Sequence, residues 1–575
     1  MIRSSCWLGL GVYALSTLSG CGSSDSSTAA ASPGAGGAAG ASTGGSGQGV
    51  GGTATAGTSS TGKGGSGAGA AGGSATGGSG AGGNANAGAG GGGAAGGATT
   101  KVGPASVLQH HNHATRDGLF VDPAFTKIAA AGLTRDAKFD GTITGQLYGQ
   151  VLYVDDPGGN DLVIAATEEN AVIALKASDG TVAWMKTLDP PVAKSKLPCG
   201  NIQTLGITGT PVIDPATRTL YVAAMTTPDG GTTKRHKVYA LSLDDGGVVA
   251  GWPVDVQAMV TAPIAFDSTV QNQRSALLLF GGSVYVAYGG HWGDCGNYHG
   301  WVVGIPTADP TKVTAWATMA KAGGIWAPGG LASDGDFFYG ATGNTFNAGA
   351  SWGQGEGVLR FGPGPAFSGM ADDYYAPKNW QSLDQQDADI SGSGPLIVDL
   401  PGATPSKLIV QLGKDGNAYL LDRQKLGGFD GQLSTTAVST QEIIQAGAVY
   451  ATSQATYVSL ASKGKGCPSG QGGGLTTLKI APGSPPTVSV AWCADQKGRG
   501  SPIVTTTDGK ANAIVWATSS NGNARLYGFD GDTGAPVYTG GGAAEQLGYV
   551  RNFTTPIAAK GRIFVGGDDK IYAFK

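Results

Sequence analysis

An internal repeat of short apolar strands runs from residue 148 to the end of the chain and limits the folds that the chain can adopt. Each unit holds three short strands, a turn with Asp or Gly, and often a Trp on a fourth, outer strand, with clear copies beginning at Val172 and Leu526. A period of about 45–60 residues with glycine at the turns is typical of a β-propeller. No helical pattern of useful length competes with it.

Counting the repeats predicts an all-β, eight-bladed propeller, with seven blades as the alternative because the third and sixth units are poorly marked. The units start near residues 148, 207, 275, 326, 391, 443, 499 and 553. The last unit stops at its third strand, Ile571–Lys575, and so lacks an outer strand. A segment within Phe139–Gln146 could supply that strand and close the ring, which would remove exposed sheet edges.

The first residues have the pattern of an export signal. Arg3 precedes an apolar run, Trp7–Leu15, that is too short to span a bilayer, and the run leads to Leu18-Ser19-Gly20-Cys21. Residues 1–21 therefore predict a bacterial lipoprotein signal peptide with Cys21 lipidated, and an ordinary signal peptide cut elsewhere is the alternative. Because no acidic residue follows Cys21 directly, we expect an exported lipoprotein of the outer membrane or cell surface.

The next segment, residues 22–100, consists almost wholly of Gly, Ala, Ser and Thr and predicts a disordered tether with a mean reach of roughly 50 Å. Residues 101–147 lead into the propeller and close it, and residues 148–575 form it. The net charge of −4 gives no reason to expect binding to nucleic acid or to an anionic membrane surface. We expect a monomer that meets the membrane only through its lipid.

Four of the six cysteines remain after the signal peptide and the lipid have taken one each, and they allow three pairings. Cys467 follows the second strand of the sixth unit and Cys493 ends its outer strand, so both fall on one face of a blade. Cys199 precedes the inner strand of unit two, and Cys295 joins the second and third strands of unit three, again on one face. Disulfides 467–493 and 199–295 are therefore expected, as suits an oxidising compartment.

Aromatic and polar side chains gather at strand ends in the middle of the repeat, and converging strand ends are where sites are built. The motifs are, in order, Gly323–Trp326, Thr342–Asn344, Asp387–Asp389 and Lys414–Arg423. Trp326 and Asn344 are 18 residues apart.

In this order the four motifs resemble the site motifs of the pyrroloquinoline-quinone (PQQ) dehydrogenases, whose eight-bladed propeller holds a quinone and calcium in a central funnel. The resemblance implies that Trp326 stacks on the quinone, that Asn344 ligates calcium, and that Lys414 touches the quinone oxygens. The family's catalytic aspartate, which also lies at the metal, falls on Asp389, with Asp387 as the alternative.

Two features of that family pattern differ in this chain. The place of the family's calcium-binding glutamate falls in Gly289–Asp294, which holds His291 but no glutamate, so only Asp294 could serve as the carboxylate ligand. The family's adjacent cysteine pair, which covers the quinone, has the single counterpart Cys199. A vicinal disulfide is therefore impossible, and a 199–295 bridge would stand at the funnel mouth beside His291 and Asp294.

Two hypotheses of function follow. The first is a surface-anchored, PQQ-dependent oxidoreductase of an alcohol or sugar, in which Asp389 is the general base, Lys414 polarises the quinone and calcium acts as Lewis acid. The second is a non-catalytic propeller that binds protein or glycan, with Trp326 as blade packing and Asp389 and Lys414 as a structural ion pair. The chain contains no Cys-x-x-Cys-His haem motif, so an enzyme would need a separate electron acceptor.

A histidine cluster, His110-His111-Asn112-His113, is conspicuous in a chain with six histidines. A metal site needs ligands on a fixed scaffold, whereas this cluster borders the tether. The sequence favours a docking segment that covers a propeller face, with metal binding as the alternative.

Overall fold

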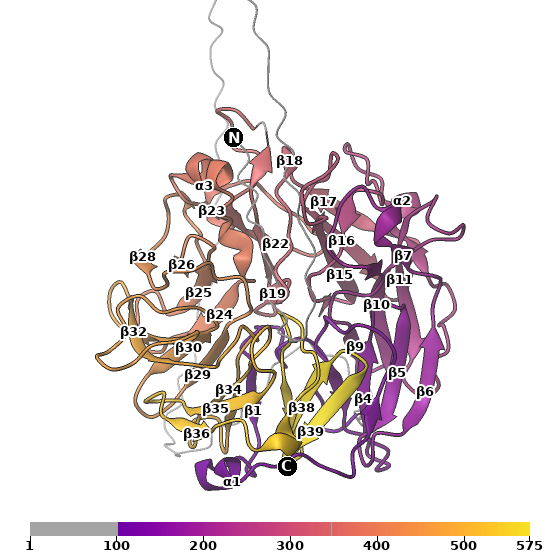
Figure 1. Ribbon diagram of the computed structural model, residues 1–575. Helices are drawn as coiled ribbons and strands as arrows, with labels where there is room; N and C mark the ends of the chain where they lie inside the picture. The colour runs from indigo at the N-terminus through magenta and orange to yellow at the C-terminus, as the bar shows by residue number, and fades with distance from the viewer. Residues whose placement is uncertain (1–101, 347) are drawn as a thin grey trace, which may run out of the picture. The chain divides into compact units, whose positions relative to one another are not determined.

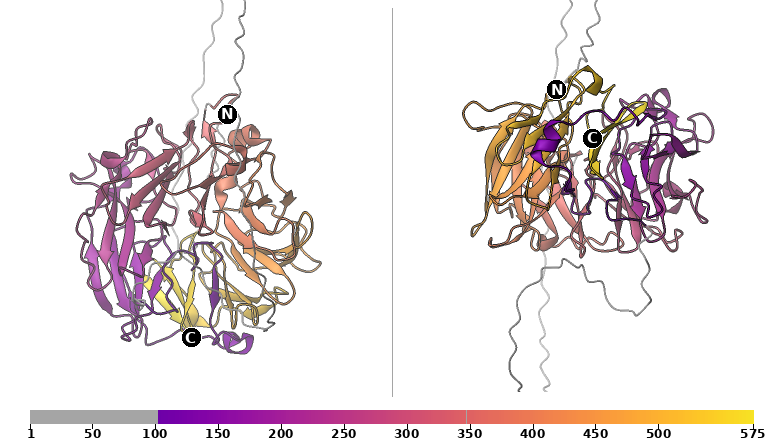
Figure 2. Two further views of the ribbon diagram at one scale, coloured as in Figure 1. Left: turned by 180° about the vertical axis from the view of Figure 1, so that it is seen from behind. Right: turned by 90° about the horizontal axis from the view of Figure 1, so that it is seen from below.

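The computed structural model describes residues 102–346 and 348–575, and within them eight sheets are arranged around one axis (Figures 1 and 2). The all-β, eight-bladed propeller is therefore confirmed, and the seven-bladed alternative is not. The predicted signal peptide, lipidated Cys21 and tether lie outside the described residues. No helix among the described residues is long and apolar enough to cross a membrane.

In the first four blades the inner strand comes first, and each later strand pairs antiparallel with the strand before it. There are two exceptions: in blade three β13 pairs with the end of β15, and blade four ends with β27, a strand from the next repeat that pairs parallel with β23. The strands are β3 (Leu152–Val154), β4 (Leu162–Ala166), β5 (Ala171–Lys176) and β6 (Val182–Thr187) in blade one; β9 (Val212–Asp214), β10 (Thr219–Thr226), β11 (Arg235–Ser242) and β12 (Val254–Asp255) in blade two; β13 (Gln271–Asn272), β14 (Leu278–Phe280), β15 (Ser283–Gly290), β16 (Trp301–Pro306) and β17 (Thr314–Ala317) in blade three; β19 (Ala332–Ser333), β20 (Phe338–Thr342), β22 (Gly357–Phe361), β23 (Tyr374–Ala376) and β27 (Gly428–Phe429) in blade four.

The last four blades repeat this order, with strands from the N-terminal part of the domain added to blades seven and eight. The strands are β24 (Leu396–Asp399), β25 (Lys407–Leu412), β26 (Asn417–Asp422) and β28 (Ser434–Ala437) in blade five; β29 (Ala448–Ala451), β30 (Thr456–Leu460), β31 (Leu475–Ala481) and β32 (Thr487–Ala494) in blade six; β1 (Leu119–Val121), β33 (Ile503–Thr506), β34 (Ile514–Thr518), β35 (Leu526–Asp530) and β36 (Pro536–Tyr538) in blade seven; β37 (Ile557–Ala559), β38 (Arg562–Gly567), β39 (Lys570–Phe574) and β2 (Gly141–Thr142) in blade eight.

Short elements fill the connections between blades. Two of them are ribbons of two strands that tie neighbouring loops together. The ribbons are β7 (Val192–Ala193) with β8 (Thr204–Leu205) and β18 (Lys321–Ala322) with β21 (Thr345–Phe346). The other short elements are the helices α1 (Lys127–Ala131), α2 (Val256–Met259) and α3 (Trp380–Gln386), and the 3-10 turns η1 (Lys194–Lys196), η2 (Ala371–Asp373), η3 (Ile390–Gly392) and η4 (Ala543–Glu545).

Burial explains the sequence pattern of the blades. Strands near the axis have neighbours on both faces, so β4 and β10 are buried along their whole length and read as unbroken apolar runs. Tryptophans of outer strands fasten one blade to the next: the Trp184 indole donates to the Leu243 carbonyl at 2.8 Å, and the Trp492 indole donates to the Gly531 carbonyl at 2.9 Å. At these two positions the outer-strand Trp therefore makes an inter-blade contact.

The ring closes between the two ends of the domain. β2 is the outer strand of blade eight and pairs with β39, Gly141 facing Ile571. It lies inside Phe139–Gln146, the segment from which the sequence predicts the closing strand. Figure 1 shows the yellow strands of blade eight beside the indigo first blade. Since β2 covers the edge of β39, the last blade presents no unpaired third strand.

An axial segment, Val107–Val121, runs past the free edges of the inner strands. Its carbonyls accept backbone hydrogen bonds from successive blades: Leu108 from Ile213 at 2.8 Å, Ala114 from Ser333 at 2.7 Å, Thr115 from Ile397 at 3.3 Å, Asp117 from Val449 at 2.7 Å and Gly118 from Val504 at 2.9 Å. The buried Arg116 guanidinium serves blades three and four by donating to the carbonyls of Leu277 at 2.9 Å and Leu331 at 2.8 Å. The histidine cluster therefore belongs to a segment that lines the axis.

Both predicted disulfides are present. Cys467, in the loop between β30 and β31, is bonded to Cys493 near the end of β32, at a sequence separation of 26. Cys199 and Cys295 join loops of blades two and three at a sequence separation of 96. The second bond links neighbouring blades on one face, as its place in the repeat predicts.

Removing each bond tests the contribution of loop length. Loop-closure entropy predicts a loss of unfolding free energy of about 4.7 kcal/mol for Cys199→Ser/Cys295→Ser and about 3.5 kcal/mol for Cys467→Ser/Cys493→Ser. Denaturant titrations of both double variants beside the wild type would measure the losses. A larger loss for the shorter loop would contradict the expectation.

Candidate functional site

Four loops carry the predicted site residues, and they meet on one face of blades four and five. Trp326 lies in the loop from β18 to β19, Asn344 follows β20, Asp389 lies before β24, and Lys414 lies between β25 and β26. Reciprocal backbone hydrogen bonds join the first two loops: the amide of Gly323 donates to the Asn344 carbonyl at 2.7 Å, and the amide of Gly343 donates to the Gly324 carbonyl at 3.0 Å.

Asp389 is the residue on which these loops converge. Its side chain is 2% exposed; its Oδ1 accepts the backbone N–H of Asn344 at 2.7 Å, and its Oδ2 lies 2.5 Å from the Lys414 ammonium. Its carbonyl accepts the backbone N–H of Lys414 at 2.8 Å. A Cβ at Gly343 would lie 2.5 Å from Oδ1, so the middle residue of Thr342–Asn344 has to be glycine for the carboxylate to keep this place.

Lys414 connects the carboxylates to the indole. Its side chain is 14% exposed, its Nζ also pairs with the exposed Asp387 at 2.8 Å, and Nζ lies 5.4 Å from the centre of the Trp326 ring. Burial opposes its charge, but the carboxylates of Asp389 and Asp387 outweigh that effect and raise the pKa of Lys414 above its ordinary value. The site therefore holds a fixed positive charge beside a half-buried indole at neutral pH.

Two side chains of the cluster have polar groups without a hydrogen-bond partner among the described residues. The Asn344 carboxamide, on a residue 7% exposed, and the Trp326 indole N–H make no hydrogen bond with another residue of the described ranges. A ligand over the indole could therefore meet an amide, an ammonium and a carboxylate without displacing an existing side-chain bond of Asn344 or Trp326.

Two further carboxyl groups support the cluster, and the sequence motifs do not include them. Glu356 is fully buried; its Oε2 accepts the backbone N–H of Ile390 at 2.8 Å, and its Oε1 has no hydrogen-bond partner among the described residues. Burial, with the nearby charge of Asp389, raises the pKa of Glu356 well above its ordinary range. Burial likewise raises the pKa of Asp384 to about 6, although Thr345 donates two hydrogen bonds to it. In the sequence, the only local sign of a role for Glu356 is that it is the one acidic residue in the glycine-rich run Gly353–Gly357.

The other predicted ligands lie on the neighbouring blade and are engaged there. Asp294 accepts the Tyr298 hydroxyl at 2.6 Å. His291 is buried with Nε2 at 3.2 Å from the Thr269 carbonyl, and burial lowers its pKa to about 4, so it is neutral at pH 7. Cys199 is bonded to Cys295, and its sulfur would lie 3.6 Å from a Cβ at Gly293. The disulfide thus stands beside Asp294. Burial raises the pKa of Asp294, and the charges of Asp387 and Asp389 add to that effect, so Asp294 lies near enough to the Asp389 cluster to interact with it electrostatically.

Comparisons with known proteins support the fold. No family model matches the chain, and no curated protein matches it. Among solved structures it is similar to the quinohemoprotein alcohol dehydrogenase ADHIIG of Pseudomonas putida HK5, at 12% identity, over 82% of this chain and 80% of that one, with a TM-score of 0.57. It is also similar to the quinohemoprotein alcohol dehydrogenase of Comamonas testosteroni, at 14% identity, over 82% of this chain and 80% of that one, with a TM-score of 0.55. A europium-containing methanol dehydrogenase is similar at 14% identity, over 81% of this chain and 90% of that one, with a TM-score of 0.54.

At these identities the similarity establishes the architecture alone. The chain folds as a quinoprotein-like β-propeller, as the four motifs predict. Activity and ligands have to be argued from the residues of the site.

The buried Glu356 predicts a measurable effect of pH on stability. A carboxyl group whose pKa is raised by folding costs stability as pH rises, because the unfolded chain releases the proton near pH 4.5 and the folded chain keeps it. Wild-type unfolding free energy should fall by up to about 1.4 kcal/mol per pH unit from this group above pH 5. Glu356→Gln should remove that slope, whereas Asp387→Asn at an exposed carboxylate should not; parallel slopes for wild type and Glu356→Gln would contradict the assignment.

Proposed function

We propose that the Trp326–Lys414 cluster binds a quinone cofactor and that the protein oxidises an alcohol or sugar with it. The observation that carries the proposal is the convergence of four separate motifs in one contact network around Asp389. A half-buried indole offers a flat surface, an ammonium suits quinone oxygens, and a buried carboxylate suits an alcohol proton.

Each side chain of the cluster would have a distinct task. Trp326 would hold the plane of the ring, and Lys414 would direct its charge at the ring oxygens. Asn344 would orient the ligand through its unpaired carboxamide. Asp389 would take the hydroxyl proton of the substrate. The bound quinone would supply the two-electron oxidation by accepting hydride, and a separate electron acceptor would return it to the oxidised form.

The donor set does not suit a calcium ion as it stands. Calcium takes six to eight oxygen ligands, but both oxygens of Asp389 are engaged, one of them by the positively charged Lys414, and Asp294 bonds to Tyr298. The described residues hold no group of three or more His, Cys, Asp or Glu side chains placed to bind a metal. We therefore assign no step of the reaction to calcium.

The setting of the enzyme is part of the proposal. The lipobox-like segment ending at Cys21 and the following tether support an exported lipoprotein of the outer membrane or cell surface, acting as a monomer. Substrate would then come from outside the cytoplasm, and the net charge of −4 gives no reason to propose a nucleic-acid partner.

A second candidate function is a binding propeller without turnover. Trp292, 62% exposed, lies between His291 and Asp294 on the loop that Cys295 fastens to the neighbouring blade. An exposed indole on a fastened loop is a typical contact for protein or glycan. On this view the Lys414–Asp389 pair only stabilises the loops.

Quinone binding separates the two functions. Titrating the full-length protein with PQQ, followed by the absorbance of the quinone, should give saturable binding that Trp326→Ala weakens at least about tenfold because the stacking surface is lost. Trp292→Ala removes an exposed indole outside the cluster and should bind as the wild type does. No saturation at high micromolar quinone would reject the oxidoreductase proposal.

Turnover tests the role of Asp389 against its neighbour. With quinone and an artificial electron acceptor, Asp389→Asn should lower kcat by about 100-fold or more, as expected for loss of a general base. Asp387→Asn, which pairs with the same lysine from an exposed position, should change kcat by no more than about threefold. Equal losses in both variants would show that pairing to Lys414, rather than proton transfer, explains the effect.

A further inference from the structure

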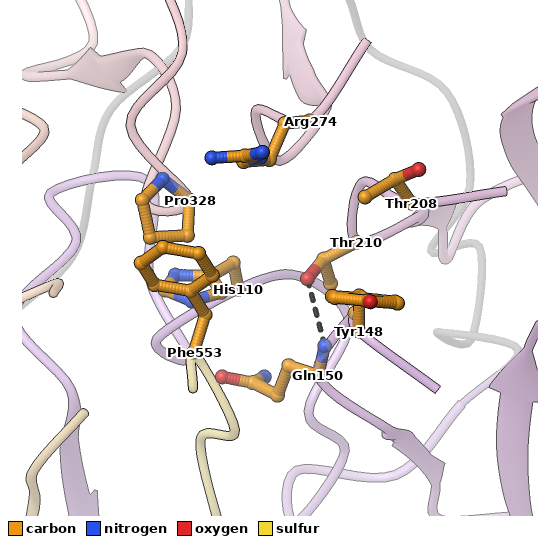
Figure 3. A pocket seen from close by; sticks show the side chains of 9 residues that line it. His110, Tyr148, Gln150, Thr208, Thr210, Arg274, Pro328 and Phe553 are labelled. Atoms are coloured by element: carbon orange, nitrogen blue, oxygen red, sulfur yellow. Dashed lines mark hydrogen bonds between the residues drawn. The ribbon is translucent and has the colours of Figure 1, made fainter. Parts of the chain in front are cut away.

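The space beside Arg274 at the axis is too small for an organic ligand. Figure 3 shows the guanidinium above Pro328, Phe553 and His110, and the cavity there measures about 10 Å³, which is room for about one water molecule. The charge of Glu168 also acts on Arg274, so the guanidinium has a counter-charge within the protein. A larger hollow lies at one end of blade four.

This blade-four pocket has a volume of about 370 Å³, which falls in the range of small-molecule sites. It is formed by the turn before β20, the end of β22 and the loop that leads from β22 through η2 to β23. The side chains of its walls are Phe337, Arg360, Phe367, Ser368 and Asp373. All five belong to one blade, and none of them is part of the candidate functional site.

The blade-four pocket and the candidate functional site lie at opposite ends of the antiparallel pair β20 and β22. The pairing of Thr342 with Gly357 marks the end next to the candidate site, since Thr342 begins the motif Thr342–Asn344. The pairing of Phe338 with Phe361 marks the other end, directly after Phe337 of the pocket. About four residues of strand, or roughly 14 Å, therefore separate the two places.

Backbone hydrogen bonds hold the loop that forms the floor of the pocket. Gly362 and Ala366 exchange N–H···O=C bonds of 2.9 and 3.2 Å, which close the loop at its base. The backbone N–H of Gly364 donates to the hydroxyl of Tyr285 at 2.9 Å and so fastens the loop to blade three. Because the floor is already fixed, a ligand pays little ordering entropy when it binds.

Two phenyl rings give the pocket flat apolar walls. Phe337 is 39% exposed, and the guanidinium carbon of Arg360 lies 4.9 Å from the centre of its ring. The ring of Phe367 is held in place by Trp316 and Phe361, with 5.8 Å between ring centres in each case. A ligand with an apolar face would remove the exposed part of Phe337 from water, which favours binding.

The ion pair beside these rings keeps one donor and one acceptor in reserve. Of the five N–H groups of Arg360, Nε donates to Asp373 Oδ1 at 2.6 Å, Nη2 lies 2.5 Å from the same oxygen, and Nη1 donates to the carbonyls of Gln424 at 2.7 Å and Arg423 at 3.4 Å. One N–H of Nη2 therefore has no partner in the described ranges. Asp373 Oδ2 accepts the Ser368 hydroxyl and no other donor of those ranges, so it can accept one further bond.

The same ion pair limits the charge that a ligand can carry. Arg360 and Asp373 neutralise each other, so a charged ligand would give up hydration without gaining a free counter-ion. A hydroxyl group can donate to Asp373 and a neighbouring hydroxyl can accept from Arg360 without any change in charge. The pocket therefore suits a neutral molecule with an apolar face and adjacent hydroxyls.

We propose that the blade-four pocket binds a neutral sugar ring, with an apolar face of the ring on Phe337 and two adjacent hydroxyls on Asp373 Oδ2 and Arg360 Nη2. The C–H groups of a pyranose form such a face, and its hydroxyls project from the edge. This binding site is separate from the exposed Trp292, and it goes beyond the oxidoreductase proposal without depending on quinone binding.

Saturation-transfer NMR of the full-length protein with methyl glucoside and methyl galactoside tests the pocket. At least one of them should bind at up to about 10 mM, since one ring face and two hydrogen bonds support millimolar affinity. Phe337→Ala should weaken that binding at least about tenfold, whereas Phe337→Tyr, which keeps the ring, should retain it. Asp373→Asn should weaken it at least about threefold because the ionised acceptor is lost. Thermal unfolding of each variant checks that it is folded.

Phe429→Ala is the matched control, since Phe429 is 48% exposed on β27 of the same blade and lies outside the pocket; it should bind sugar as the wild type does. Failure of both glycosides to bind, unchanged binding in Phe337→Ala, or equal binding of cyclohexanol would each overturn the sugar assignment. Sugar binding that is lost in Trp326→Ala but kept in Phe337→Ala would place the sugar at the candidate functional site and reject the pocket. PQQ binding should be unchanged in Phe337→Ala, so the failure of either proposal leaves the other standing.

Discussion

Backbone hydrogen bonding at the axis is the constraint on which the rest of this structure depends. Each inner strand has one partner within its blade, so its other edge faces the axis with unpaired N–H and C=O groups, which are costly to bury. The axial segment satisfies part of this demand in blade after blade, from Leu108 to Gly118, and β1 continues it by pairing with β33. The same segment places His110 at the axis, where its carbonyl accepts a hydrogen bond from Arg116.

The candidate site follows from the connections rather than from the strands. Loops that enter an inner strand and loops between second and third strands share a face in a propeller, and the site draws on both kinds in blades four and five. Asp389 receives a bond from each neighbouring loop, which fixes the loops and uses both of its oxygens. The Asp389–Lys414 ion pair therefore both holds the loops together and supplies groups for the proposed chemistry. Because a binding protein could keep the same pair for the first purpose alone, fold similarity cannot separate an enzyme from a binding protein.

Charge pairing is a feature of the candidate site. Around Trp326 the single cation, Lys414, is matched by Asp389 and Asp387, and burial raises the pKa of the neighbouring Glu356 well above its ordinary value. Two other cations near the axis also have partners, since Arg551 forms an ion pair with Asp568 and the buried Arg116 donates to three backbone carbonyls.

The sequence by itself determined the repeat and the order of the site motifs, and it predicted eight blades, with seven as the alternative, and both disulfides, because each rests on local strand periodicity or on a position within the repeat. It did not identify buried Glu356, the pairing of Asp294 with Tyr298, or the contacts of Arg116 at the axis. Those features depend on contacts between distant segments: Arg116 and Leu331, for example, are 215 residues apart and meet only when the ring has closed. Tertiary structure decides them because burial and missing partners belong to the assembled axis, and no local pattern of residue types encodes them.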